Sequence, residues 1–202
     1  MTQKTDYSAI RVETAPTAEP VSVAELKANL RLNDTTWDAT VLPLLIEAAR
    51  QAVENECNRA LINTTFQQFY DEWPYSSEYP YIELVRAPVA SVSSIKYIDT
   101  DGDEQTWTAS NYRVDMYSQP ARVELAYAQS WPAIRQIVNS ITIEYVAGYG
   151  ASSASVPDAL RQAVLMLASD MFEHSESQAE SALHDNRTVM RLIQAYKIPT
   201  VY

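Results

Sequence analysis

Near the C-terminal end, two histidines and several carboxylates have types and spacing that suit metal chemistry. Asp170 and His174 lie four residues apart, which places both side chains on one face of a helix. Glu173, Glu176 and His184 are close by in the sequence. Imidazole and carboxylate groups bind zinc, so this pattern allows a metal-dependent hydrolase. We favour the alternative of a histidine at a helix C-terminus, where a cation is stabilised, followed by an acidic solvated loop. We therefore expect no metal and no cofactor.

Other common catalytic patterns are missing from the sequence. It contains no GxSxG turn for a nucleophilic serine, no HExxH helix and no phosphate-binding P-loop. Gly148-Tyr149-Gly150 lacks the third glycine of a dinucleotide-binding loop. The acidic pairs Asp71-Glu72 and Asp101 with Asp103 fall where we expect turns, in which acidic residues are common. We therefore expect no catalytic residues, and predict an interaction protein rather than an enzyme.

Aromatic residues gather in two segments that we predict to be loops. Trp73, Tyr75, Tyr79 and Tyr81 lie in or beside the first, and Trp131 lies in the second. Their rings could stack on sugars or bases, or pack at a protein contact. This leaves a second hypothesis open, namely a glycan- or protein-binding β-module carried on a helical stem.

Composition and charge indicate a folded protein that does not grip nucleic acid. The 202 residues are 47% hydrophobic and 20% charged, which is ordinary for a domain with a core. The net charge of −11 argues against binding to phosphates, which needs clustered Lys and Arg. No apolar run approaches the length of a membrane span, and the N-terminus lacks the apolar core of a signal peptide. We expect a soluble protein made in the cytoplasm.

A long amphipathic helix over Asp38 to Arg59 is the element around which we expect the fold to be organised. Its apolar residues recur at three- and four-residue steps and include many alanines, so a second helix can approach closely. The comparable partner is Pro157 to His174. Pro43 leaves two alternatives open: the regular helix starts near Thr40, or it kinks at the proline. Cys57 falls on the apolar face, which favours a buried structural thiol over a nucleophile.

Shorter helices are predicted on either side of these two. Ser22 with Glu25 forms a capping box, and we expect that helix to run to about Leu32. A final short helix is expected over 189–196, after a polar loop at 175–187. Residues 1–20 contain two prolines and no helical period, and we expect them to form an extended arm.

Between the two long helices, six segments mostly alternate apolar with polar residues, which is typical of half-buried strands. Asp101-Gly102 is a hairpin turn signal. The predicted fold is therefore α+β: a small antiparallel helical bundle, formed by N- and C-terminal helices, with an inserted antiparallel β-domain. We assign 1–60 to the arm and first helices, 61–150 to the insertion, and 151–202 to the last helices and tail. The six segments are 66–70, 81–84, 92–98, 112–114, 122–125 and 141–145.

The chain resembles the phage head–tail connector, or adaptor, family, in its longer form with a β-rich insertion. The ordered set of motifs that carries the resemblance spans most of the chain. It consists of EPVSVAELK (19–27) leading to LRL (30–32), LIEAAR (45–50) with NRAL (58–61), IEYVAGYG (143–150) and VPDALRQA (156–163).

This resemblance implies a structural virion protein at the head–tail junction. Such adaptors form a homo-oligomeric ring, twelve-fold when assembled, below the portal protein. The ring extends the DNA channel, through which DNA passes without specific binding, and docks the stopper or tail-completion protein. The acidic composition agrees with a lumen to which DNA does not stick.

Apolar residues in the last helix and tail are our candidate docking segment for a partner. At a free terminus such residues have little other reason to be present. The alternative is that they cover this chain's own helices. The candidates are Leu192, Tyr196, Val201 and Tyr202.

Overall fold

The structure, a computed structural model, describes residues 9–33, 36–73, 80–174 and 186–198. The described residues form two compact units, each assembled from two separate stretches of the chain. Residues 9–15 and 63–148 belong to the β unit, and residues 16–62 and 149–198 belong to the helical unit. Helices together with antiparallel sheets confirm the α+β class expected from the sequence.

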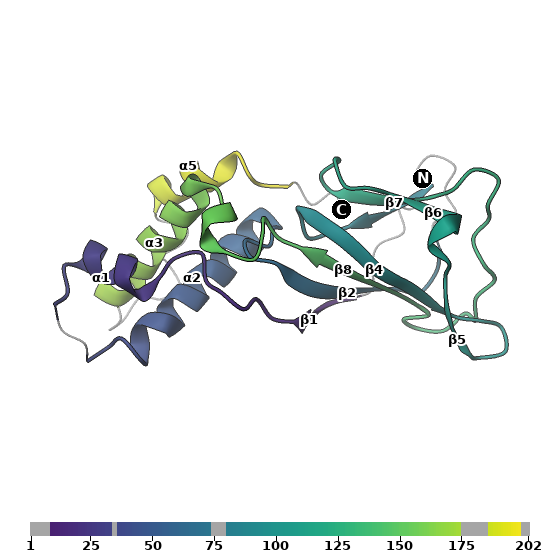
Figure 1. Ribbon diagram of the computed structural model, residues 1–202, viewed down its shortest axis with the longest axis horizontal. Coiled ribbons are helices and arrows are strands. Elements are labelled where there is room, and N and C mark those ends of the chain that lie inside the picture. The colour runs from purple at the N-terminus through teal and green to yellow at the C-terminus, as the bar shows by residue number, and fades with distance from the viewer. Residues whose placement is uncertain (1–8, 34–35, 74–79, 175–185, 199–202) are drawn as a thin grey trace. The chain divides into compact units, whose positions relative to one another are not determined.

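The helical unit consists of α1 (Val23–Leu30), α2 (Val41–Cys57), α3 (Asp158–Glu173) and α5 (Arg187–Gln194). Figure 1 shows α2 and α3 side by side, and α3 also packs on α1 and α5. The two long helices come from opposite ends of the sequence, so the unit closes only when both ends are present. No helix in the described ranges is both long and apolar enough to cross a bilayer.

The predicted capping box starts α1. The Ser22 hydroxyl accepts a hydrogen bond from the Glu25 amide at 3.2 Å, and the Glu25 carboxylate accepts one from the Ser22 amide at 2.7 Å. Hydrogen bonds from the Ser22 backbone and side chain, and then the charge of Arg161, lower the pKa of Glu25. The helix ends at Leu30, two residues before the predicted end, because Arg31 takes a left-handed conformation with φ 58°.

The helix α2 begins at Val41, with Pro43 inside its first turn, which decides between the two alternatives left open by the sequence. A proline is tolerated there because the first backbone amides of a helix have no partner within it. The carbonyl of Trp37 accepts hydrogen bonds from the amides of Val41 and Leu42. The turn before the helix therefore satisfies amides that the helix itself leaves free.

The core of the helical unit lies between α2, α3 and α5, and small residues allow these helices to come close together. Ala49 on α2 and Ala163 and Ala168 on α3 are fully buried. Around them lie larger aliphatic side chains, which fill the remaining space. The buried aliphatic residues on these helices are Leu42, Ile46, Val53, Leu160, Val164, Leu167, Val189 and Ile193.

A buried guanidinium fixes the chain leading into α1 against α2. Arg50, 6% exposed, donates to Glu19 and to Glu54, each at 2.8 Å. Burial by itself lowers the pKa of Arg50, but the hydrogen bonds and charges of the two carboxylates outweigh it and raise the pKa. A charge withdrawn from water remains favourable only when it is paired in this way.

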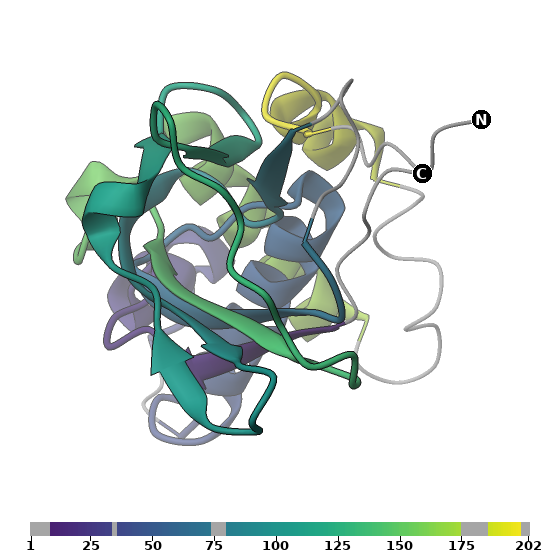
Figure 2. The same ribbon diagram turned by 90° about the vertical axis from the view of Figure 1, so that its right-hand side faces the viewer.

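The β unit contains a five-stranded antiparallel sheet with the strand order β1-β2-β8-β4-β5. The strand β1 lies along one edge of this sheet (Figure 2). In the central strands β2 and β8, alternate residues are buried, as their two-residue period predicts. The strands are β1 (Ala9–Thr14), β2 (Thr64–Tyr70), β4 (Val89–Ile98), β5 (Glu104–Thr106) and β8 (Ile141–Ala147).

A smaller sheet of three strands, in the order β3-β7-β6, completes the β unit. Its strands are β3 (Tyr81–Leu84), β6 (Tyr112–Asp115) and β7 (Ala121–Leu125). A buried amide links the two sheets: Gln68 on β2 donates to the Glu83 carbonyl at 2.9 Å and accepts from the Val85 amide at 3.1 Å. This full set of partners allows a polar group at 0% exposure.

All six strand segments predicted from alternation are present, and the described residues contain two further strands that alternation did not predict. The strand β1 falls within the arm that we expected to be extended, and it pairs with β2. The three-residue β5 forms the far side of the predicted hairpin at Asp101-Gly102. Both unpredicted strands lie at sheet edges, where little burial is needed and the alternation signal is accordingly weak.

Two leucines near the start of α2 offer a matched test of this core. Leu42 is fully buried and Leu44 is 65% exposed, although only two positions separate them. Because a buried leucine loses both transfer free energy and packing, we expect Leu42→Ala to lower the free energy of unfolding by about 2–5 kcal/mol. Leu44→Ala should change it by less than about 0.5 kcal/mol. Urea unfolding followed by circular dichroism measures both; equal losses would contradict the described packing.

Candidate functional site

Asp170 and His174, which we considered as metal ligands and did not favour, lie at the C-terminal end of α3. Asp170 accepts a hydrogen bond from the Asn186 side chain at 2.5 Å, and Asn186 in turn caps the start of α5. The His174 ring nitrogen Nδ1 lies 3.0 Å from the Asp170 carbonyl oxygen. Among the described residues, no three His, Cys, Asp or Glu side chains gather closely enough to hold a metal ion. Glu176 and His184 lie outside the described residues.

Two of the aromatic residues considered for glycan binding, Trp73 and Trp131, pack against each other. Trp73 is fully buried, stacks on Trp131 with ring centroids 4.8 Å apart, and also contacts Trp107. Its indole nitrogen donates to the Pro132 carbonyl at 2.9 Å. The interpretation of Trp73 as a ring that stacks on a sugar is therefore wrong, because neither of its faces is free. Tyr75 and Tyr79 lie outside the described residues.

The acidic turn after β4 is held by a single carboxylate. One oxygen of Asp99 accepts hydrogen bonds from the amides of Asp101, Gly102 and Asp103, at 2.9–3.0 Å. The Asp103 amide is the largest cause of a lowered pKa at Asp99, followed by the Gln105 side chain. Gly102 has φ +101°, a conformation that side chains disfavour. Asp101 and Asp103, an acidic pair noted in the sequence, therefore belong to a turn whose conformation Asp99 fixes.

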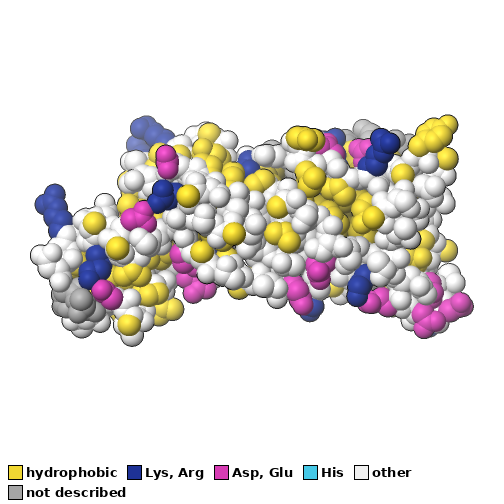
Figure 3. Space-filling model, viewed as in Figure 1, with side chains coloured by type: hydrophobic (Ala, Val, Ile, Leu, Met, Phe, Trp, Pro, Cys, Tyr) yellow, Lys and Arg dark blue, Asp and Glu magenta, His cyan; other side chains and the backbone are white. Residues whose placement is uncertain are grey.

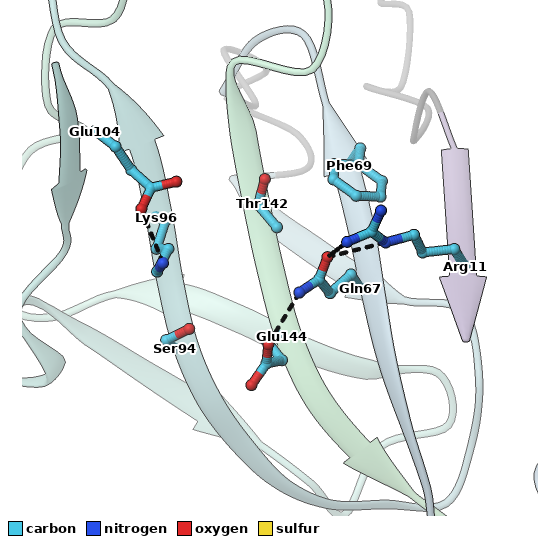
Figure 4. A pocket seen from close by; sticks show the side chains of 8 residues that line it. All are labelled: Arg11, Gln67, Phe69, Ser94, Lys96, Glu104, Thr142 and Glu144. Atoms are coloured by element: carbon cyan, nitrogen blue, oxygen red, sulfur yellow. Dashed lines mark hydrogen bonds and ion pairs between the residues drawn. The ribbon is translucent and has the colours of Figure 1, made fainter. Parts of the chain in front are cut away.

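The outer face of the five-stranded sheet carries a polar hollow of about 300 Å³ (Figure 4), which we call the polar sheet face. Its side chains come from all five strands and, in the central strands, are those that alternate with the buried residues. The residues that line it are Arg11, Gln67, Phe69, Ser94, Lys96, Glu104, Thr142 and Glu144.

Hydrogen bonds run across the strands of this polar sheet face. Arg11 donates from Nε and Nη2 to the Gln67 side-chain oxygen, at 3.1 and 2.7 Å, and Gln67 donates to Glu144 at 3.0 Å. Lys96 donates to Glu104 at 2.8 Å, which is the main cause of its raised pKa. Acidic, basic and amide groups are mixed here.

The sequence analysis missed the polar sheet face as a site. Arg11, Gln67 and Lys96 are ordinary surface residues in one dimension, and strand pairing alone brings them together. The signal that was available is the alternation of Arg11 and Glu13 with Ile10 and Val12, which is typical of a strand.

Of the candidate docking residues, Leu192 and Tyr196 are half-buried and pack against the core of the helical unit. Arg59 holds this end in place: it donates from Nε to the Tyr196 carbonyl at 2.5 Å, and its guanidinium lies 6.0 Å from the ring centroids of Tyr196 and Tyr149. Val201 and Tyr202 lie outside the described residues. The contacts with the helices leave part of Leu192 and Tyr196 exposed, so a docking role stays a prediction.

Beyond Tyr196, the chain is tied to the C-terminal end of α2. The Ile198 amide donates to the Cys57 carbonyl at 3.1 Å, and the Asn58 side chain donates to the Ile198 carbonyl at 3.0 Å. Lys197 forms an ion pair with Glu56. Described residues up to Ile198 therefore belong to the helical unit.

A family model, described as head completion protein, matches residues 19–199. The chain belongs to the head completion protein family. This membership and the structural likenesses below confirm the recognition of a phage head–tail connector made from the sequence motifs. No protein with a curated description matches the chain.

Solved structures of gene transfer agent (GTA) particles resemble this head completion protein over nearly its whole length. A chain from the neck of the empty GTA particle, computed with C6 symmetry, is 28% identical with a TM-score of 0.78. A chain from the neck of the native particle, computed with C12 symmetry, is 29% identical with a TM-score of 0.75. A chain from the native GTA virion is 26% identical with a TM-score of 0.72. In each case the match covers 96% of this chain and 97% of the other.

The cysteine provides a chemical test of the described core. Cys57 is fully buried, and burial raises the pKa of its thiol to about 11. Because the thiolate is the reactive form, we expect almost no alkylation of the native protein by iodoacetamide at pH 8. Unfolding in urea should restore ordinary reactivity, as mass spectrometry would show. Rapid alkylation of the native protein would contradict the burial of this thiol.

Proposed function

We propose that this head completion protein forms a ring at the head–tail junction, below the portal protein, where it extends the DNA channel and docks the stopper or tail-completion protein. The observation that carries the proposal is the likeness to neck chains of GTA particles over 96% of this chain. Those necks were solved with C6 and C12 symmetry, which supports a multimeric ring. Twelve copies is the stoichiometry that we propose.

The architecture that we propose for this role is a helical bundle with an inserted β-domain. Residues 1–60 form the arm and first helices, 61–150 the insertion, and 151–202 the last helices and tail. The packing of α2 on α3 supports the plan, because it joins the first and last thirds of the sequence. The first strand departs from a simple division, since β1 pairs with β2 of the insertion.

Passage of DNA without specific binding is part of the proposal, and the charge of the chain supports it. A net charge of −11 disfavours tight contact with phosphates. On the face shown in Figure 3, basic side chains are scattered among acidic ones and do not form a continuous patch. A channel wall of this kind lets DNA move without the release of many bound counterions.

We also propose that the C-terminal segment docks onto the portal protein. The residues that we propose for this contact are Leu192, Tyr196, Val201 and Tyr202. The anchoring of Ile198 at the end of α2 supports this proposal, because it holds the chain next to Leu192 and Tyr196 in a fixed place.

Imaging of the assembled junction tests the ring. Purified protein should add one ring of density below the portal when mixed with portal particles, as seen by cryo-electron microscopy. Symmetry analysis should give twelve copies. Failure to bind either portal or tail proteins would contradict the proposed function.

Deletion of residues 199–202 tests the docking segment. We expect the shortened protein to lose binding to the portal while its melting temperature stays unchanged, because the anchoring contacts of Ile198 remain. As a control, Tyr117→Ala removes a tyrosine that is 98% exposed in the β unit and should leave portal binding intact. If the shortened protein still binds the portal, the proposed docking role of the C-terminal segment is wrong.

A further inference from the structure

The strand β1 is weakly buried in the five-stranded sheet. It forms one edge of that sheet and pairs only with β2. Five of its six residues are exposed, and none belongs to the buried core. Val12 lies opposite the buried Phe66, yet it remains 54% exposed. The core thus ends at β2, and β1 is held mainly by backbone hydrogen bonds.

The connection of β1 to the rest of the chain allows it to pair elsewhere. No hairpin joins β1 to β2, because residues 15–63 lie between them and include α1 and α2. Directly after β1, the chain is fixed to the helical unit. Arg50 binds Glu19, and Arg161 donates to the Pro20 carbonyl at 3.0 Å. The strand β1 and its partner β2 both belong to the β unit, but the chain that directly follows β1 is fixed within the helical unit.

When β1 leaves, β2 becomes an open edge with a defined sequence preference. Its unpaired amides and carbonyls form a template for another extended strand. On the polar sheet face, Gln67 presents the side-chain oxygen that receives Arg11, and Glu144 holds Gln67 from the other side. These side chains favour one register, since a slip of one residue moves Arg11 to the opposite face.

We infer that, in the assembled ring, β1 of each copy pairs with β2 of the neighbouring copy in place of its own β2. This inference rests on the proposed ring, which brings a second β2 edge within reach of the arm. The exchanged pairing keeps the antiparallel register and the contact of Arg11 with Gln67. Each copy gives a strand on one side and receives one on the other, so the contact is head-to-tail and closes in a ring.

Little free energy opposes this exchange. The same backbone and side-chain bonds form within one copy or between two, so the equilibrium depends on effective concentration and on strain in the connecting segment. In the free protein the strand's own β2 has the higher effective concentration. Neighbours held in a ring remove that advantage.

Cysteine pairs distinguish the two arrangements. Arg11 and Gln67 are directly opposite each other in the strand pairing and point away from the core. Opposite residues of antiparallel strands lie within the range that a disulfide can bridge. We propose to mix Arg11→Cys protein with Gln67→Cys protein, assemble the mixture on portal particles, and oxidise it. Neither variant can form this disulfide within one chain, and Cys57 is buried.

Two controls accompany the mixture. Rings of Arg11→Cys protein alone should give no dimer, because the exchanged strand then faces Gln67. The double variant Gln67→Cys/Glu144→Cys joins opposite residues of β2 and β8, and should give a disulfide within each chain. This second control shows that oxidation reached the sheet.

The expected result is a reducible dimer of twice the 22.7 kDa chain from rings of the mixture, and none from the unassembled mixture. Rings that form but give no dimer would overturn the strand exchange and leave the proposed function standing. If imaging of the same sample shows no ring on the portal, both the exchange and the proposed function are wrong.

Discussion

The packing of α2 against α3 is the contact on which the helical unit depends. Ala49, Ala163 and Ala168 are buried there, and the larger side chains around them come from both helices. A single amphipathic helix cannot keep its apolar face in water, so each helix needs the other. Because they lie far apart in the sequence, their contact makes residues 16–62 and 149–198 one unit. The β unit is built from a separate set of pairings, with its own buried polar link at Gln68.

Much of the fold could be predicted because the patterns were long or doubly marked. The seventeen residues of α2 repeat their apolar positions over several turns, and Ser22 with Glu25 gives two signals for one helix start. In the central strands β2 and β8, buried residues alternate clearly with more exposed ones. The start of α2 at Val41, two residues before Pro43, could not be decided from the sequence, since it depends on the Trp37 carbonyl that accepts the first amides. The alternation pattern missed the edge strands β1 and β5, because these two strands bury almost nothing.

The candidate site was harder to predict than the fold, because pairing in three dimensions creates it. Arg11, Gln67 and Glu144 are distant in sequence and become neighbours only when β1, β2 and β8 align. Trp73 looked like a surface ring because of its polar and proline-rich surroundings, but Trp107 and Trp131 enclose it. The family resemblance succeeded where residue chemistry did not, since an ordered set of weak motifs specifies a family even when no single motif does.

The central structural claim is that α2 and α3 form one cooperative unit across the length of the sequence. Native-state hydrogen exchange of Leu167→Ala tests it most directly, because Leu167 is fully buried on α3. If the helices open together, the free energy of opening measured at amides of α2 and of α3 should fall by the same amount, about 2–5 kcal/mol. If α3 alone loses protection and α2 amides exchange as in the unaltered protein, the two helices do not stabilise each other and the claim is wrong.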